Sequence, residues 1–203
     1  MTIDPKILSP RDVYNILVSV IVPRPIAFVT SINTQNLVNA APYSFFNALT
    51  GTPPLIMISA GRKNGTMKHT AENILHQKEF VVNLVNEELV HSMNIASADF
   101  PPEISEIDRL RITLVPSVVV RPPRIAESPV NCECRLYKHL EIGSEPTDLI
   151  IAEIVQFHVK DELYAKGLID QAKLKVIGRM GGNAYCRVNE LFEMERYKYE
   201  EEK

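Results

Sequence analysis

Apolar residues recur along the chain in short runs that are separated by turn-forming residues. Most of these runs are rich in Val and Ile and have the length of a β-strand. In residues 130–142 apolar and polar side chains alternate, which is typical of a strand with one buried face. The pattern predicts strands at residues 26–33, 38–45, 55–60, 79–85, 111–120, 130–142 and 148–160.

The arrangement of these strands indicates a fold class. The segment "GSEPTD" separates the two longest predicted strands, and its Gly, Pro and Asp residues predict a hairpin turn. Many strands at this spacing with few helices favour a closed or split β-barrel over a doubly wound sheet. We therefore expect a mainly β protein with peripheral helices.

Helix signals are fewer. Ser9, Pro10 and Asp12 form a typical helix start with Ser9 as the N-cap, and this helix is expected to end before Pro23. Two proline-bearing segments, 98–110 and 120–129, predict surface crossings. Further helices are predicted at residues 67–77, 87–97 and 189–196.

Composition narrows the class of protein. The chain has 203 residues, of which 45% are hydrophobic, so we expect one substantial core and a single domain over residues 1–203. The longest apolar runs have strand length and no signal peptide is recognised, so we expect a cytoplasmic protein with no membrane partner. The formal net charge of −3 provides no general attraction to nucleic acid. Any basic site must be local.

Cysteine and histidine usage indicates neither a disulfide framework nor a metal site. The chain has three cysteines and five dispersed histidines, without a paired metal-ligand spacing. Cys132 and Cys134 lie two residues apart on a predicted strand, so both thiols face the same side. We interpret both as core residues.

The stretch "GRKNGTMKHT", residues 61–70, places positive charge at the start of a predicted helix. Exposed cations at that position oppose the helix dipole and cost roughly 0.3–1 kcal/mol each. A bound phosphate would reverse the sign of this effect and accept hydrogen bonds from free backbone N–H groups. Its side-chain partners would come from Arg62, Lys68, Ser59, Thr66 and Thr70. The alternative is a solvated basic loop in which Thr66 caps the helix. The stretch is not a Walker loop, and the chain has no GxGxxG turn.

A second stretch, "NAAPYSFFNAL", is nearly free of charge and combines small and aromatic residues. Asn39, Ala40 and Ala41 are short enough for a planar ligand to reach peptide N–H groups, and Pro42 is typical of a strand edge or bulge. The aromatic residues Tyr43, Phe45 and Phe46 could form walls beside such a ligand. The alternative is a buried hairpin whose aromatic side chains belong to the core, which is the favoured interpretation of Phe45 and Phe46.

In order and spacing, several blocks together resemble the flavin reductase-like, FMN-binding split-barrel family. The blocks are RPIAFVTS, NAAPYSFFNAL, PPLIMIS, KHT before a helix, and EFVVNLV. That family includes flavoredoxin-type proteins and reductase components such as nitrilotriacetate monooxygenase component B. The similarity runs from about residue 9 to 185, which leaves residues 186–203 as a C-terminal extension.

This resemblance implies a six-stranded Greek-key split barrel and a homodimer with FMN near the subunit interface. It also implies hydride transfer from NADH or NADPH to the flavin. His158 corresponds to a histidine near the nicotinamide, and Gly181, Gly182 and Tyr185 correspond to a late loop that closes over the site from the partner subunit. The remaining positions implied to bind FMN are Thr30, Ser31, Asn39, Ala40, Ala41, Pro42, Tyr43, Ser44, Ser59, Arg62, Lys68 and Thr70.

The alternatives for the weaker positions stay open. His158, on a long predicted strand, is equally compatible with a hydrogen-bonded surface residue, and Gly181 with Gly182 is compatible with a turn that needs positive φ. The chain also departs from the family pattern. It has Lys68-His69-Thr70 where Lys-Asp-Thr is common, Phe28 where Trp is common, and "NTQNL" in place of an Asp-Gly-type turn. These departures affect turn geometry and specificity more than phosphate binding.

Three functions are compatible with these features. The first is a flavin reductase that passes electrons from NAD(P)H through FMN to oxygen, an oxygenase component or another acceptor. The second is a flavin-binding electron carrier without NAD(P)H oxidation. The third is a β-rich binding module whose basic loop meets another anion. The residues leave open the choice between NADH and NADPH, and whether FMN is a substrate or a prosthetic group.

Overall fold

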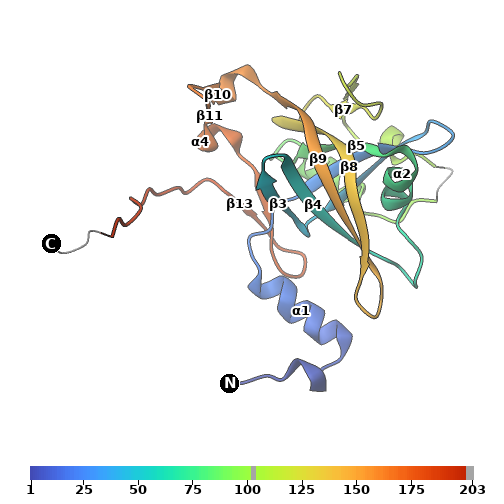
Figure 1. Cartoon of the computed structure of the whole chain (residues 1–203), viewed down its shortest axis with the longest axis vertical. Coiled ribbons are helices and arrows are strands. Elements are labelled where there is room, and N and C mark those ends of the chain that lie inside the picture. Colours follow the sequence, from blue (N-terminus) through green and yellow to red (C-terminus); the bar gives the residue numbers. More distant parts are fainter. Residues whose placement is uncertain (102–103, 200–203) are drawn as a thin grey trace.

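A seven-stranded antiparallel sheet forms the body of the protein in the computed structural model, which describes residues 1–101 and 104–199. The strand order is β2-β1-β5-β8-β9-β4-β3, so the sheet edges are β2 and β3. Figure 1 shows this sheet with α1 and the C-terminal segment extending away from it. Its strands are β1 Ala27–Ile32, β2 Val38–Tyr43, β3 Phe46–Gly51, β4 Pro54–Gly61, β5 Glu79–Leu84, β8 Val130–Ile142 and β9 Thr147–Val159.

Short elements surround the sheet. The α-helices are α1 Pro10–Val20, α2 His69–Gln77, α3 Val90–Ile95 and α4 Gln171–Leu174, and the 3-10 helices are η1 Pro5–Ile7, η2 Glu106–Arg109 and η3 Asp161–Leu163. The two-stranded pairs are β6 Leu114–Val115 with β7 Arg124–Ile125, β10 Tyr164–Ala165 with β11 Leu168–Ile169, and β12 Ile177–Arg179 with β13 Tyr185–Arg187. No helix in the described part of the chain is long and apolar enough to cross a membrane.

The predicted mainly β class is confirmed, but the sheet has seven strands instead of the six that were expected. The predicted strand 38–45 ends at Tyr43, and a further strand, β3, begins at Phe46. β2 pairs with β1 while β3 pairs with β4, so the break after Tyr43 sends consecutive strands to opposite edges of the sheet. The Ser59 N–H donates to the Phe45 carbonyl at 2.8 Å, and β2 also lies close to β4. The two edges therefore approach each other and the sheet curls.

The core is divided into two apolar clusters by strand β1. Ala27 and Val29 pack in one cluster with Phe80 and Ile58. Phe28 packs in the other with residues such as Leu89. Because successive side chains of a strand point to opposite faces, β1 is buried on both sides. Cys132 and Cys134 lie in the first cluster as free thiols, which confirms their interpretation as core residues.

The predicted strand 111–120 is wrong except for the two residues of β6. The chain there turns so that the backbone N–H groups of residues 118–120 donate to the buried carboxylate of Glu133, at 2.7, 2.7 and 3.1 Å. An apolar Val-rich run does not form a strand here because a side chain, and not another strand, accepts its hydrogen bonds.

The predicted helix at 189–196 is also wrong, since these residues have no regular secondary structure. Phe192 and Met194 are 83% and 82% exposed, so the segment has no packing surface in this chain. Isolated helices of this length are marginal in water without tertiary packing.

Candidate functional site

A cavity of about 550 Å³ lies between the edge strand β2 and the start of helix α2. Its wall is formed by Asn39 and residues 41–43 of β2, by residues 63–64 and 66–70, by residues 96–101 after α3, and by Glu106. The cavity therefore brings together the two stretches that the sequence singled out, although β3 and β4 separate them in the chain.

The start of α2 contributes free backbone N–H groups to this wall. The N-cap of α2 is Lys68, which makes no side-chain capping hydrogen bond. Thr66 instead exchanges two backbone hydrogen bonds with Lys63, at 3.0 and 2.9 Å, so the proposed capping role of Thr66 is wrong. An uncapped helix N-terminus carries partial positive charge and binds anions.

Two lysines stand at the cavity and share one carboxylate. Lys63 Nζ lies 2.6 Å from Asp99 Oδ2, and Lys68 Nζ lies 2.9 Å from Asp99 Oδ1. The hydrogen bond from Lys63 has the largest effect on Asp99, followed by that from Lys68, and together they lower its pKa to about 2. Sequence reasoning missed Asp99, because nothing in its proline-rich surface segment indicates a lysine partner.

The inner part of the cavity wall is polar and buried. Asn39 Nδ2 donates to Thr70 Oγ1 at 2.9 Å, and Tyr43 lines the same wall. Burial raises the pKa of Tyr43 to about 12, so its hydroxyl stays protonated. Glu106 was another residue that sequence reasoning missed, and burial raises its pKa.

Glu106 occupies a backbone N–H group at the edge of β2 that a ligand could otherwise bind. The Ala40 N–H points away from β1 and donates to Glu106 Oε1 at 2.6 Å. Pro42, two residues on, faces the same way and has no N–H. The expectation that a ligand reaches peptide N–H groups is therefore wrong at these two positions. Ala41 still lines the cavity with a small side chain.

Arg62 is a correction to the predicted phosphate site, because the structure places it outside the cavity wall. Its guanidinium binds the Asp148 carboxylate through Nε at 2.9 Å and Nη2 at 2.7 Å, and it also lies 2.9 Å from Glu141. His139 Nε2 contacts the same Asp148 at 2.9 Å. The hydrogen bond from Arg62 holds the pKa of Asp148 below its usual range.

Four predicted hydroxyl positions also lie outside the wall and stabilise neighbouring segments. The buried Thr30 hydroxyl donates to the Pro123 carbonyl at 2.5 Å, and the buried Ser31 hydroxyl accepts from Asn73 at 3.1 Å. Ser44 Oγ lies 3.4 Å from Arg24 Nε. Ser59 lies on β4, where its backbone holds the break between β2 and β3. Ala40 is fully buried behind the wall.

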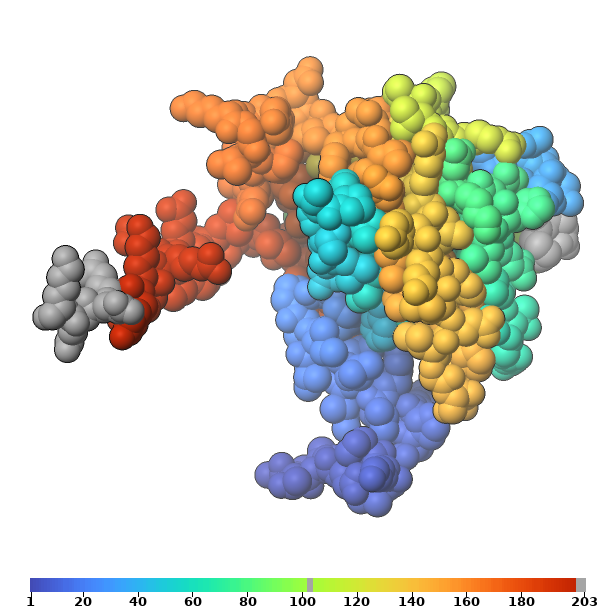
Figure 2. Space-filling view, viewed as in Figure 1, coloured from blue at the N-terminus to red at the C-terminus, as the bar shows by residue number. Residues whose placement is uncertain are grey.

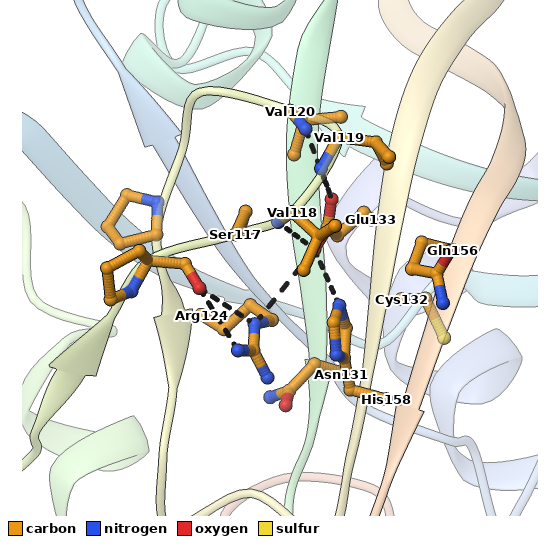
Figure 3. A network of polar contacts seen from close by, with 12 residues as sticks. Ser117, Val118, Val119, Val120, Arg124, Asn131, Cys132, Glu133, Gln156 and His158 are labelled. Carbon is orange, nitrogen blue, oxygen red and sulfur yellow. Dashed lines mark hydrogen bonds and ion pairs between the residues drawn. The ribbon is translucent and has the colours of Figure 1, made fainter.

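His158 belongs to a separate buried network (Figure 3). Its Nε2 lies 2.6 Å from Oε1 of Glu133, the carboxylate that also binds the N–H groups of residues 118–120. Burial alone would raise the pKa of Glu133, but the backbone N–H groups and His158 outweigh it and the pKa lies below its usual value. The hydrogen bond of this strand residue is therefore confirmed, but its expected surface position is wrong, since the side chain is 19% exposed. The nicotinamide role of His158 stays a prediction.

The late glycine loop connects β12 and β13 next to α1. A Cβ on Gly181 would lie 2.7 Å from Ser19 Oγ, and Gly182 has φ +57, so close packing favours glycine at the first position and backbone conformation favours it at the second. The Arg179 guanidinium stacks over the Tyr185 ring at 4.4 Å. In this chain the loop is packed on α1 and lies outside the cavity wall.

Comparison with known proteins identifies the family. Residues 19–175 match the model of the flavin reductase like domain. An uncharacterized protein of Halalkalibacterium halodurans is 43% identical over 97% of this chain and 96% of its own length. Protein YwrF of Bacillus subtilis, also uncharacterized, is 38% identical over 93% of this chain and 95% of its own.

Solved structures agree with this match. Nitrilotriacetate monooxygenase component B from Bacillus cereus is 38% identical, with a TM-score of 0.93, over 96% of this chain and 98% of that one. The 2-nitrobenzoate 2-nitroreductase NbaA of Pseudomonas fluorescens is 33% identical, with a TM-score of 0.89, over 97% of this chain and 96% of that one. With the curled antiparallel sheet and its cavity, these matches show that the chain belongs to the flavin reductase-like split-barrel family.

Proposed function

We propose that the protein binds FMN in the cavity beside β2 and α2 and reduces it with NADH or NADPH. The observation that carries this proposal is the meeting of the uncapped start of α2, Lys63 and Lys68 with the small residues of β2 around one cavity. Membership of the flavin reductase-like family supports an oxidoreductase that uses a flavin.

The residues of the cavity fit the two ends of FMN. The phosphate would be held by the N–H groups at the start of α2 and by Lys63 and Lys68, which supply positive charge. The ring would lie along Ala41 and Pro42, where side chains are small, with the protonated Tyr43 hydroxyl and the Asn39–Thr70 hydrogen bond behind it. Arg62 is not part of this assignment, because its guanidinium is already paired.

The chemistry asks little of the side chains. When bound, FMN would supply the hydride-accepting chemistry, and the protein would contribute binding, alignment and electrostatics. Lysine ammonium groups and the helix start favour the more negative form of a bound ligand. The name of the Bacillus cereus protein makes an oxygenase component one candidate acceptor of the electrons.

The absorption spectrum of the purified protein tests the proposal most directly. Flavin bands, or their appearance after tight uptake of added FMN, are expected. NADH or NADPH consumption that depends on FMN would then separate a reductase from the electron carrier, which would bind FMN without consuming either. A protein that shows no bound flavin and no measurable affinity for FMN would contradict both functions and leave the binding module for another anion.

We also propose that the protein is a homodimer. A second cavity of about 680 Å³ has a largely apolar wall that includes Leu84, Phe157 and Leu174. The chain leaves this cavity at Leu191 and then exposes Phe192, Met194, Tyr197 and Tyr199, each at least 80% accessible. Figure 2 shows this C-terminal segment standing off from the body of the molecule. A second copy offers both a matching apolar cavity and a matching segment, which favours a symmetric pair.

Light scattering of the full chain tests this proposal. A mass of two chains is expected, and truncation after Val188 should shift the equilibrium toward monomer. A full-length protein that is monomeric at micromolar concentration would contradict the dimer.

A further inference from the structure

The carboxylate of Asp99 forms ion pairs with both lysines of the proposed phosphate site. Each of its oxygens faces one ammonium group, Oδ2 at 2.6 Å from Lys63 and Oδ1 at 2.9 Å from Lys68. All three side chains line the same cavity. A phosphate entering it would seek the same ammonium protons, because carboxylate and phosphate oxygens are both strong acceptors for charged donors.

The two acceptors are not equal. The carboxylate carries one negative charge, whereas a phosphate monoester carries about −1.5 to −2 at pH 7 and has three acceptor oxygens. A phosphate therefore binds the lysines more strongly than Asp99 does. Its net binding free energy is smaller, because the two ion pairs with Asp99 must break first. The carboxylate remains close to the bound phosphate and repels it.

The ion pairs of Asp99 with Lys63 and Lys68 are exposed enough for a ligand to displace the carboxylate. The side chains of Lys63, Lys68 and Asp99 are 62%, 38% and 55% exposed. Ion pairs with such exposure contribute little to stability, so the fold does not depend on them. The segment that carries Asp99 follows α3 and has no regular secondary structure at this residue.

We propose that Asp99 is a built-in competitor of the flavin phosphate, which weakens FMN binding and speeds its release. This inference rests on the proposed function and deepens it, because it concerns the exchange of the cofactor at the same cavity. With Asp99 present, FMN is suited to be a substrate that comes and goes. Without Asp99, FMN would stay bound longer in the same cavity.

The variant Asp99→Asn tests the proposal, since asparagine keeps the size of the side chain and removes its charge. FMN binding is followed by quenching of flavin fluorescence, and release by stopped flow. FMN affinity is expected to rise between about 2-fold and 30-fold, the range that two exposed ion pairs together are worth. Most of the gain should be in a slower release. Riboflavin, which lacks the phosphate, should bind both proteins equally.

Two controls separate competition from a general effect of charge. Glu145→Gln changes the net charge equally at an exposed hairpin residue outside the cavity, and it should leave FMN affinity unchanged. In a Lys63→Ala/Lys68→Ala background, Asp99→Asn should no longer tighten FMN binding through the lysines, so most of its gain should disappear.

The outcomes are distinguishable. Wild-type protein that binds FMN better than riboflavin, together with an Asp99→Asn variant of equal or weaker FMN affinity, would overturn the role of Asp99 and leave the proposed function standing. A gain of equal size for riboflavin would overturn competition with the phosphate. Absence of FMN binding to both proteins would overturn the proposed function and the inference with it.

Discussion

Two acid–base clusters begin in the same stretch of ten residues and differ in almost every physical respect. Arg62 binds Asp148, whose side chain is fully buried, while the Arg62 side chain is 15% exposed. The next residue, Lys63, shares Asp99 with Lys68, and all three of these side chains are substantially exposed. The first cluster joins β4 to the β8–β9 hairpin, and the second stands at the cavity.

This difference shows what decides whether a charge stabilises the fold or remains available to a ligand. The guanidinium of Arg62 is planar and meets the Asp148 carboxylate with two parallel hydrogen bonds, a geometry that lysine cannot provide. A buried carboxylate without its partner is costly, so this pair is not exchangeable. An exposed lysine returns to water at little cost, so its carboxylate partner can be displaced.

The largest expected effect comes from breaking the buried cluster. Asp148→Ala should lower the free energy of unfolding by about 3 kcal/mol, because it removes the buried carboxylate that Arg62 and His139 share and leaves Arg62 only its exposed partner Glu141. Chemical denaturation monitored by circular dichroism measures this loss. Glu141→Ala is the matched control, since that carboxylate is 55% exposed and its loss should change stability by less than about 0.5 kcal/mol. Equal losses in both variants would contradict the distinction.

Lys68→Ala breaks the exposed cluster. FMN affinity should fall about tenfold, as expected for one charge-assisted hydrogen bond, while riboflavin affinity stays unchanged. The denaturation midpoint should move little, because the side chain is 38% exposed. Titration of both ligands measures the difference. Equal losses for FMN and riboflavin would contradict the assignment of the phosphate end.

Acid weakens the buried cluster by protonating Asp148. The hydrogen bond from Arg62 lowers this pKa in the folded protein, so the cluster stabilises the fold fully above the unfolded value of about 3.9. As pH falls below that value and through the lower folded pKa, this contribution is lost. Wild-type stability should therefore fall more steeply than that of Asp148→Ala as the pH falls below about 4. Parallel pH profiles would contradict the stabilising role of Asp148.

The smallest expected effect concerns Thr66, which lies between Lys63 and Lys68 in the chain. Thr66→Ala should leave stability within about 0.5 kcal/mol, since Lys68, and not Thr66, is the N-cap of α2. Ser9→Ala is the contrasting variant and should cost about 1 kcal/mol, because Ser9 Oγ accepts the Asp12 N–H at 3.2 Å. Thermal denaturation compares the two. A loss for Thr66→Ala as large as that for Ser9→Ala would restore the capping interpretation.

Much of the fold was predictable from local pattern. Strand 130–142 has the predicted bounds, and helix α1 begins after the predicted N-cap Ser9. The misses share a cause. β3 is largely exposed and lacks a buried apolar pattern, and residues 118–120 bind a distant carboxylate. The segment 189–196 has helix-forming residues but no packing partner in this chain.

The candidate site was predictable only in outline. The small residues of β2 and the basic start of α2 do meet at one cavity, as their unusual composition suggested. Asp99 and Glu106 were missed because an acidic residue in a surface crossing has no local feature that distinguishes a solvated side chain from a cavity wall. Arg62 was included in error because its partner Asp148 lies 86 residues away in the chain.

The sequence by itself determined the mainly β class, the place of most strands and the two stretches that form the cavity, because these depend on short-range periodicity and on residue type. Only the tertiary structure decided which charges pair. Coulomb attraction and burial depend on distance in space, and neighbours in the chain such as Arg62 and Lys63 have different neighbours in space. One became a buried structural contact, and the other became part of the cavity in which we propose that a phosphate binds.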